Sequence, residues 1–137
     1  MKKVLCDINV VLDVLLKRES FYKDSLSIFE KIEQNDFYGF LSGISIDTIF
    51  YILRKNNKTT EESKEIISQL LCIFDIATIN DEVVKNALLH NTKDLEDALQ
   101  YESALQEGCE IIFTRNEKDF PNTPKMQIIA PADFNAL

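Results

Sequence analysis

The stretch that decides the fold of this chain is VLCDINVVL, which occupies residues 4–12. Its first part, Val4 to Asp7, is a short apolar run of the kind that forms a fully buried strand. The apolar positions after it continue at helical spacing as far as Leu16. The stretch therefore predicts a strand-to-helix turn with Asp7 at its tip. Such a position borders the ligand site of open α/β sheets, although N-capping of the helix explains this aspartate alone equally well.

Outward from this turn, apolar runs alternate with helical stripes along the chain. Further strands are expected at 37–41, 75–79, 110–114 and, more weakly, 126–130. Helices are expected at about 22–35, 46–55, 59–74 and 94–107, with a short one after Asn80 and a last turn from Pro131. The alternation predicts an α/β fold in a single domain over residues 1–137. Its central parallel sheet would have four to five strands, flanked by helices on both faces.

Composition restricts the chemistry that such a domain can carry. The chain has 137 residues, 45% hydrophobic and 28% charged, as is typical of one packed domain. No apolar run could span a bilayer and no signal-peptide cleavage pattern follows Lys2, so we expect a cytoplasmic protein without a membrane partner. Three scattered cysteines and one histidine exclude a histidine-rich zinc site, and oxygen ligands select Mg²⁺ or Mn²⁺. The net charge of -8 argues against binding nucleic acid by overall attraction, a cost that a bound cation reduces.

The expected helix at 94–107 carries the most informative pattern. At 100° per residue, Asp94 and Asp97 fall in one stripe with apolar residues, whereas Glu96 lies on the opposite side and is expected to be solvated. Asp94 is best explained by the helix macrodipole, worth about 0.3–1 kcal/mol, and Asp97 is the better catalytic candidate. Two charges about 4 Å apart repel by roughly 4 kcal/mol at an effective dielectric of 20. Several gathered aspartates therefore indicate a divalent cation and phosphoryl-transfer or phosphodiester chemistry.

Four segments, taken in order, resemble the PIN-domain family, whose bacterial members include VapC-type toxins. They lie at 4–13, 42–55, 94–100 and 112–120, so the resemblance covers nearly the whole chain. It implies a Mg²⁺- or Mn²⁺-dependent endoribonuclease whose products carry a 5′-phosphate. It also implies a homodimer and a small antitoxin that covers the acidic site, a partner that suits an acidic surface.

The resemblance also assigns roles to individual residues. Asp7 and Asp97 would be metal ligands, and Asp119 keeps the later acidic position of the last segment. The family's glutamate in the second segment aligns with Thr48, and the family's aspartate after the strand-four threonine is Asn116 here. The expected supporting residues are Asn9, Asp47, Thr48, Asp94, Thr114 and Asn116. Possible RNA backbone contacts are Arg54, Lys55 and Arg115, although a solvated surface position explains each one better when it is taken separately.

Two other interpretations stay open. The departures at Thr48 and Asn116 also fit a catalytically degenerate PIN domain that binds RNA or a protein partner without cleavage. The stretch from Asp7 to Val11 also resembles a phosphatase-type D-x-D-x-V motif or a receiver-type acidic pocket. The first of these lacks its second aspartate at Asn9, and the second lacks its paired acids. Cleavage of RNA with Mn²⁺ would favour the nuclease, and a labile phosphoaspartate at Asp7 would count against it.

Overall fold

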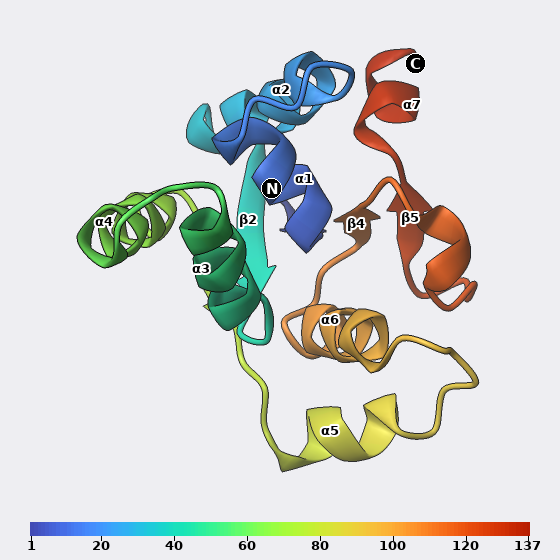
Figure 1. Ribbon diagram of the computed structural model, residues 1–137. Coiled ribbons are helices and arrows are strands. Elements are labelled where there is room, and N and C mark those ends of the chain that lie inside the picture. The colour runs from blue at the N-terminus through green and yellow to red at the C-terminus, as the bar shows by residue number, and fades with distance from the viewer.

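Five parallel strands form one sheet at the centre of the computed structural model, which describes all residues from 1 to 137 (Figure 1). The strands are β1 (Lys2–Cys6), β2 (Phe37–Ser42), β3 (Asp75–Ala77), β4 (Ile111–Phe113) and β5 (Gln127–Ile129). They lie in the order β3-β2-β1-β4-β5, and every pairing is parallel. The predicted α/β fold is confirmed, and the weak fifth strand takes part in the sheet.

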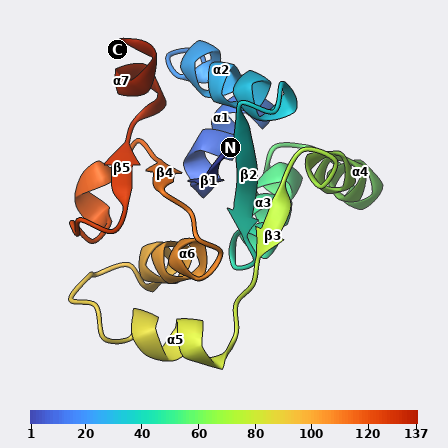
Figure 2. The same cartoon turned by 180° about the vertical axis from the view of Figure 1, so that it is seen from behind.

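Helices cover both faces of the sheet. They are α1 (Ile8–Leu15), α2 (Tyr22–Glu33), α3 (Ser45–Lys55), α4 (Thr60–Leu70), α5 (Asp81–Ala87), α6 (Leu95–Gln106) and α7 (Pro131–Asn135), with a 3₁₀ turn η1 (Glu117–Asp119). Val4 and Cys6 of β1 pack into the core with α1, α2 and α3, whereas Leu5 between them packs with α6. Figures 1 and 2 accordingly place α6 across the sheet from α2. No helix is both long enough and apolar enough to cross a lipid bilayer.

Close packing on the first face depends on Gly39 in β2. A Cβ at this position would lie 2.8 Å from Ile32 Cδ1 and 2.9 Å from Phe74 Cδ1. Helix α2 and the residue before β3 therefore rest directly on the β2 backbone, where only glycine leaves room.

The sequence predicted the start of α4 correctly but not its end. Thr59 and Glu62 form the predicted capping box, each side chain accepting a backbone N–H of the other. The helix ends at Leu70 instead of 74, because the following residues turn so that Phe74 enters the core at the start of β3. Strand β3 in turn ends at Ala77 instead of 79.

The order of the strands places a topological switch point at the carboxyl end of β1. From β1 the chain passes to β2 and β3 on one side, and only later to β4 and β5 on the other. Ligands of open α/β sheets bind at such a switch point, beyond the carboxyl ends of the strands. The Asp7 N–H donates to the Phe113 carbonyl at 3.0 Å, so the residues after β1 and β4 lie side by side there.

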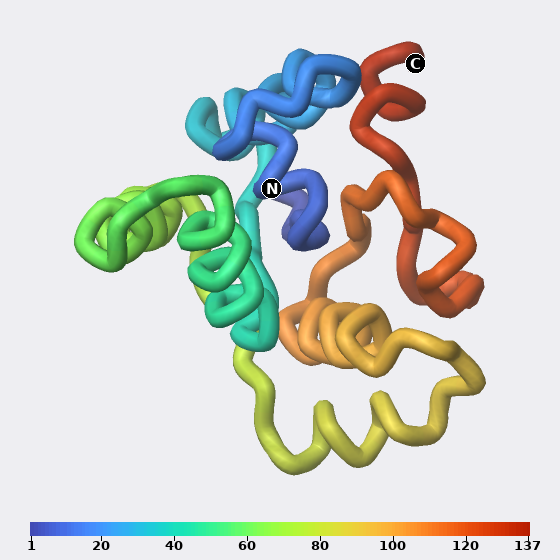
Figure 3. Tube along the Cα trace, in the orientation of Figure 1, coloured from blue at the N-terminus to red at the C-terminus, as the bar shows by residue number.

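Helix α6 approaches this edge from a long excursion of the chain. Between β3 and α6 the chain leaves the sheet and carries α5, as the tube in Figure 3 shows. Helix α5 packs on α6 through a small apolar cluster of Val83, Ala87, Ala98 and Leu99. The sequence-distant first turn of α6 thus meets the ends of β1 and β4.

Candidate active site

Asp7 lies at the tip of the turn between β1 and α1. It is only 3% exposed, and its backbone occupies the N-cap position of α1, yet its carboxylate makes no capping bond. Instead Gln100 Nε2 donates to Oδ1 and Thr114 Oγ1 donates to Oδ2, both at 2.9 Å. Burial raises the pKa of Asp7, and these two hydrogen bonds partly oppose the rise. The side chain is therefore oriented from α6 and from the end of β4 for something other than capping.

Asp97 lies in the first turn of α6, near several other carboxylates. Burial raises its pKa to about 7, and the charges of Asp94, Asp7, Asp119 and Glu96 add to the rise, in that order. Segments from three parts of the chain, the end of β1, the first turn of α6 and η1, thus bring acidic groups to the same edge of the sheet. Such a carboxyl favours either a proton or a cation at neutral pH.

Asp94 has a structural task at the start of α6. Its Oδ1 accepts a hydrogen bond from the Glu96 N–H at 2.9 Å, which makes it the N-cap of the helix. The cap fixes the first turn, and with it the placement of Asp97.

The helical wheel predicted that Glu96 would be solvated, but its side chain is half-buried in the structure. It accepts a hydrogen bond from Thr48 Oγ1 of α3 at 2.9 Å. Burial raises its pKa, the Thr48 hydrogen bond opposes the rise, and the charges of Asp94 and Asp7 add to it. This prediction is wrong because a helical wheel considers one helix alone, whereas Thr48 of α3 contacts the first turn of α6. Adjacency to Asp97 near a helix start was the only sequence signal for this residue.

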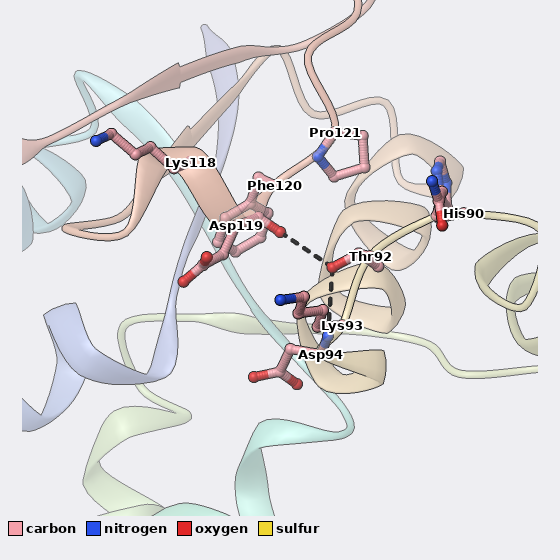
Figure 4. Close-up of a pocket in the computed structure, with 9 residues that line it drawn as sticks. His90, Thr92, Lys93, Asp94, Lys118, Asp119, Phe120 and Pro121 are labelled. Carbon is pink, nitrogen blue, oxygen red and sulfur yellow. Dashed lines mark hydrogen bonds between the residues drawn. The ribbon is translucent and has the colours of Figure 1, made fainter.

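Asp119 and Asn116 border the site from the loop after β4. The Asn116 N–H donates to Thr114 Oγ1 at 3.0 Å, which joins this loop to the hydroxyl that holds Asp7. A cavity of about 490 Å³ opens beside Asp94 and Asp119. In Figure 4, Lys93 lies between these two aspartates, while Lys118 points away from them. The Asp119 carbonyl accepts a hydrogen bond from Thr92 Oγ1 at 3.4 Å, which links η1 to the segment before α6.

The other candidate site residues on α3 lie outside the acidic cluster, the group formed by Asp7, Asp94, Glu96, Asp97 and Asp119. Asp47 is exposed, so Thr48 and not Asp47 faces α6. Arg54 and Lys55 lie at the far end of α3, about 9–10 Å along the helix from Thr48. Arg54 Nη1 donates to the Lys58 carbonyl at 3.1 Å, and Lys55 Nζ lies 5.2 Å from the centre of the Tyr51 ring.

Arg115 forms an ion pair with Asp13, a buried acid that was not among the site residues predicted from the sequence. Asp13 is fully buried and accepts two hydrogen bonds from Arg115, from Nε at 2.8 Å and from Nη2 at 3.0 Å. Ser25 Oγ at 3.2 Å and Arg18 Nη1 at 3.4 Å complete its surroundings. The signal available was an aspartate within the apolar stripe of α1. Arg18 Nη1 also donates to Asn9 Oδ1 at 3.3 Å, which ties this ion-pair group to the start of α1.

The donor set fits a hard cation, although no three acidic, histidine or cysteine side chains lie close enough together to hold a metal ion as they stand. All the available ligand atoms are oxygens, which Mg²⁺ and Mn²⁺ prefer. Gln100 Oε1 is buried without a hydrogen-bond partner, and it belongs to the amide that donates to Asp7. An orphaned acceptor next to a buried carboxylate suits a hydrated cation.

The chain is similar to known proteins over most of its length. A family model described as PIN domain matches residues 3–118. Ribonuclease VapC1 of Aquifex aeolicus (strain VF5) is 32% identical over 136 residues, which cover 97% of this chain and 93% of that protein.

Two solved structures share the fold. VapBC2 from Rickettsia felis, bound to a DNA fragment from its promoter, has a TM-score of 0.64 at 16% identity, over 92% of this chain and 96% of that chain. VapBC-1 from nontypeable Haemophilus influenzae has a TM-score of 0.68 at 13% identity, over 95% and 98%. At such identities the likeness concerns the fold alone.

Proposed function

The chain belongs to the PIN domain family, and from this premise we propose that it is a Mg²⁺- or Mn²⁺-dependent endoribonuclease, the toxin of a toxin-antitoxin pair. Its similarity to a ribonuclease VapC1 supports RNA as the substrate. The observation that carries the proposal is the buried Asp7 carboxylate, which Gln100 of α6 and Thr114 after β4 hold at 2.9 Å. In addition, burial and four neighbouring carboxylates, Asp7 among them, raise the pKa of Asp97 to about 7. Acids gathered at the carboxyl edge of a parallel sheet offer oxygen ligands of the kind that a hard cation prefers.

Each acidic residue would have a separate task. Asp7 and Asp97 would hold the cation, with Asp119 at the open side of the site. Gln100 and Thr114 keep the Asp7 carboxylate in place through their two hydrogen bonds. A bound Mg²⁺ or Mn²⁺ supplies charge stabilisation at the phosphoryl group and lowers the pKa of water. Asn9 and Asn116 border the same edge and help to arrange it.

Glu96 would supply the carboxylate that α3 lacks. Thr48 occupies the position where the family resemblance expects a glutamate, and its hydroxyl donates to Glu96 from the facing helix. The carboxylate of Glu96 also interacts with the charge of Asp7. The same region of the site therefore contains an acid, delivered by α6 instead of α3.

An antitoxin and a second copy are the proposed protein partners. The likeness to two VapBC structures supports an antitoxin. The net charge of -8 and the acidic edge suit a partner that presents basic side chains. The homodimer rests on the family resemblance.

The experiment that tests the nuclease compares Asp7→Asn and Asp97→Asn with wild type on single-stranded RNA in Mn²⁺. Each change removes a charge with little change in volume, and we expect cleavage to fall at least about 100-fold. Asp47→Asn is the matched control, because Asp47 is exposed and outside the cluster. Undiminished cleavage by both site variants would overturn the ligand assignment.

A degenerate PIN domain that binds without cutting is the second candidate, favoured by Thr48 and Asn116. A wild-type sample that retains RNA but leaves it intact with Mn²⁺, and whose melting temperature does not rise with the cation, would support it. Cleavage lost in Glu96→Gln would instead show that Glu96 contributes the acid that α3 lacks.

A further inference from the structure

A second, smaller cavity lies away from the acidic cluster, between the start of α2, the loop after β4 and the start of α7. It has a volume of about 220 Å³. Apolar atoms of Phe21, Pro131 and Ala132 line it, together with the polar side chains of Arg115 and Asp24. Pockets for whole small-molecule ligands measure roughly 300–1,000 Å³, so this one suits a single planar ring system.

Phe21 gives the cavity an aromatic wall. Its ring is stacked against the Arg115 guanidinium, whose Cζ lies 3.8 Å from the ring centre. The residue remains 41% exposed, which is unusual for a phenylalanine next to a buried ion pair. Aromatic rings and guanidinium planes are the surfaces on which unpaired RNA bases stack.

Side-chain hydrogen bonds connect this cavity to the residues after β1. Arg115 binds Asp13, Asp13 accepts from Arg18, and Arg18 in turn donates to Asn9 at the start of α1. In addition, Arg115 directly follows Thr114, whose hydroxyl holds Asp7. A chain of side-chain contacts therefore runs from the cavity through Asp13 and Arg18 to Asn9, two residues after Asp7.

The Arg18 guanidinium has N–H groups that make no hydrogen bond within the protein. Only its Nη1 makes hydrogen bonds, at 3.3 Å to Asn9 and 3.4 Å to Asp13, and its side chain is 31% exposed. Asp13 is already satisfied by the two-pronged pair with Arg115. The remaining N–H groups of a guanidinium suit the oxygens of a phosphate.

We propose that these residues form a nucleotide subsite for the RNA strand beside the acidic edge. Arg18 binds a backbone phosphate next to Asn9, and an unstacked base enters the cavity against Phe21. Asp24 supplies an acceptor for an exocyclic amino group, and Arg115 supplies donors. The inference rests on the proposed function for its substrate class, but it concerns binding and selectivity, not the cleavage step.

Binding and cleavage are measured separately to test the subsite. Fluorescence anisotropy of a labelled, short single-stranded RNA of mixed sequence is recorded with the full chain in Ca²⁺, which neutralises the carboxylates. We expect Phe21→Ala to weaken binding about tenfold. Ala132→Leu, which fills the cavity from the exposed start of α7, should weaken it similarly without removing an existing contact. Tyr38→Ala is the control, since Tyr38 is 40% exposed in β2, near the amino end of the sheet.

Arg18→Gln tests the phosphate contact by a different readout. The slope of the logarithm of affinity against the logarithm of salt concentration should become shallower by about 0.7, as for one lost phosphate contact on a single strand. Phe21→Ala should leave this slope unchanged. Thermal melting checks that each variant is folded.

The outcomes separate the subsite from the nuclease. If wild type cleaves RNA in Mn²⁺ while the Phe21 and Ala132 variants bind and cleave as it does, the subsite is wrong and the nuclease stands. If wild type binds RNA through these residues but never cleaves it, the subsite stands and the nuclease fails. RNA affinity equal in all variants, or absent in wild type, overturns the subsite.

Discussion

Replacing Asp97 by asparagine should stabilise the cation-free protein at neutral and alkaline pH. The native state holds the Asp97 proton up to a pKa of about 7, whereas the ordinary value is 3.8. Between these values the native state binds more protons than the unfolded state, so stability falls as pH rises. Burial also raises the pKa of Asp7 and of Glu96, which act in the same direction. Replacing Asp97 by asparagine removes the contribution of Asp97 to this loss of stability.

The size of the effect follows from the shift and from solvent access. At about 1.4 kcal/mol per pH unit, a rise from 3.8 to about 7 corresponds to roughly 4 kcal/mol. Asp97 is partly exposed, so solvent screening reduces this to about 1–2 kcal/mol. For a chain of this length that equals roughly 3–10 °C in melting temperature. The advantage of the variant should be small below about pH 4, grow between pH 4 and pH 7, and be complete by about pH 8.

Thermal unfolding in EDTA at several pH values measures this difference directly. Asp47→Asn carries the same change of charge at an exposed position outside the cluster, and it corrects for the effect of net charge. Mn²⁺ should reverse the order, because a ligand at 100 times its dissociation constant stabilises by about 2.7 kcal/mol and the variant binds it less well. The reasoning is refuted if Asp97→Asn gains no more than Asp47→Asn at pH 8 in EDTA.

Two further predictions concern residues that support the site. Gln100→Leu removes a hydrogen bond that lowers the pKa of Asp7. The acid limb of the profile of kcat/KM against pH in Mn²⁺ should therefore move to higher pH. If the limb does not move, Gln100 does not have this role. Asp13→Asn leaves Arg115 without its buried partner and should cost about 3 kcal/mol in urea unfolding. Asp81→Asn, which breaks an exposed pair of 3.7 Å with Lys85, should cost under about 1 kcal/mol, and equal losses would refute the distinction.

The sequence predicts the centre of the sheet well because β1, β2 and β4 are largely buried on both faces. Continuous apolar runs such as Ile111 to Phe113 have no amphipathic alternative, and helical stripes between them impose parallel connections. Asp7 could be placed for the same reason, since a strand end is a local property. The ends of α4 and β3 were less accessible, because the packing of Phe74 against Gly39 sets them from a distance.

Side-chain partners across the fold could not be read from periodicity. Glu96 was assigned to solvent because nothing in α6 alone reveals that Thr48 of α3 faces it. Arg115 was named as a possible RNA contact, with a solvated surface position preferred, but whether its charge is free depends on Asp13, about a hundred residues earlier in the chain. In both cases a charge is paired by an element that is distant in sequence and adjacent in space.

The first turn of α6 explains how one short segment can serve both the fold and the site. Asp94 caps the helix, Glu96 turns to α3, and Asp97 faces the end of β1. The positive end of the helix macrodipole offsets about 0.3–1 kcal/mol per nearby charge, well short of the repulsion among these acids. The remaining strain must be relieved by protons at low pH or by cations at high pH. The pH dependence of the cation-free protein and its affinity for Mn²⁺ are therefore two measures of the same repulsion.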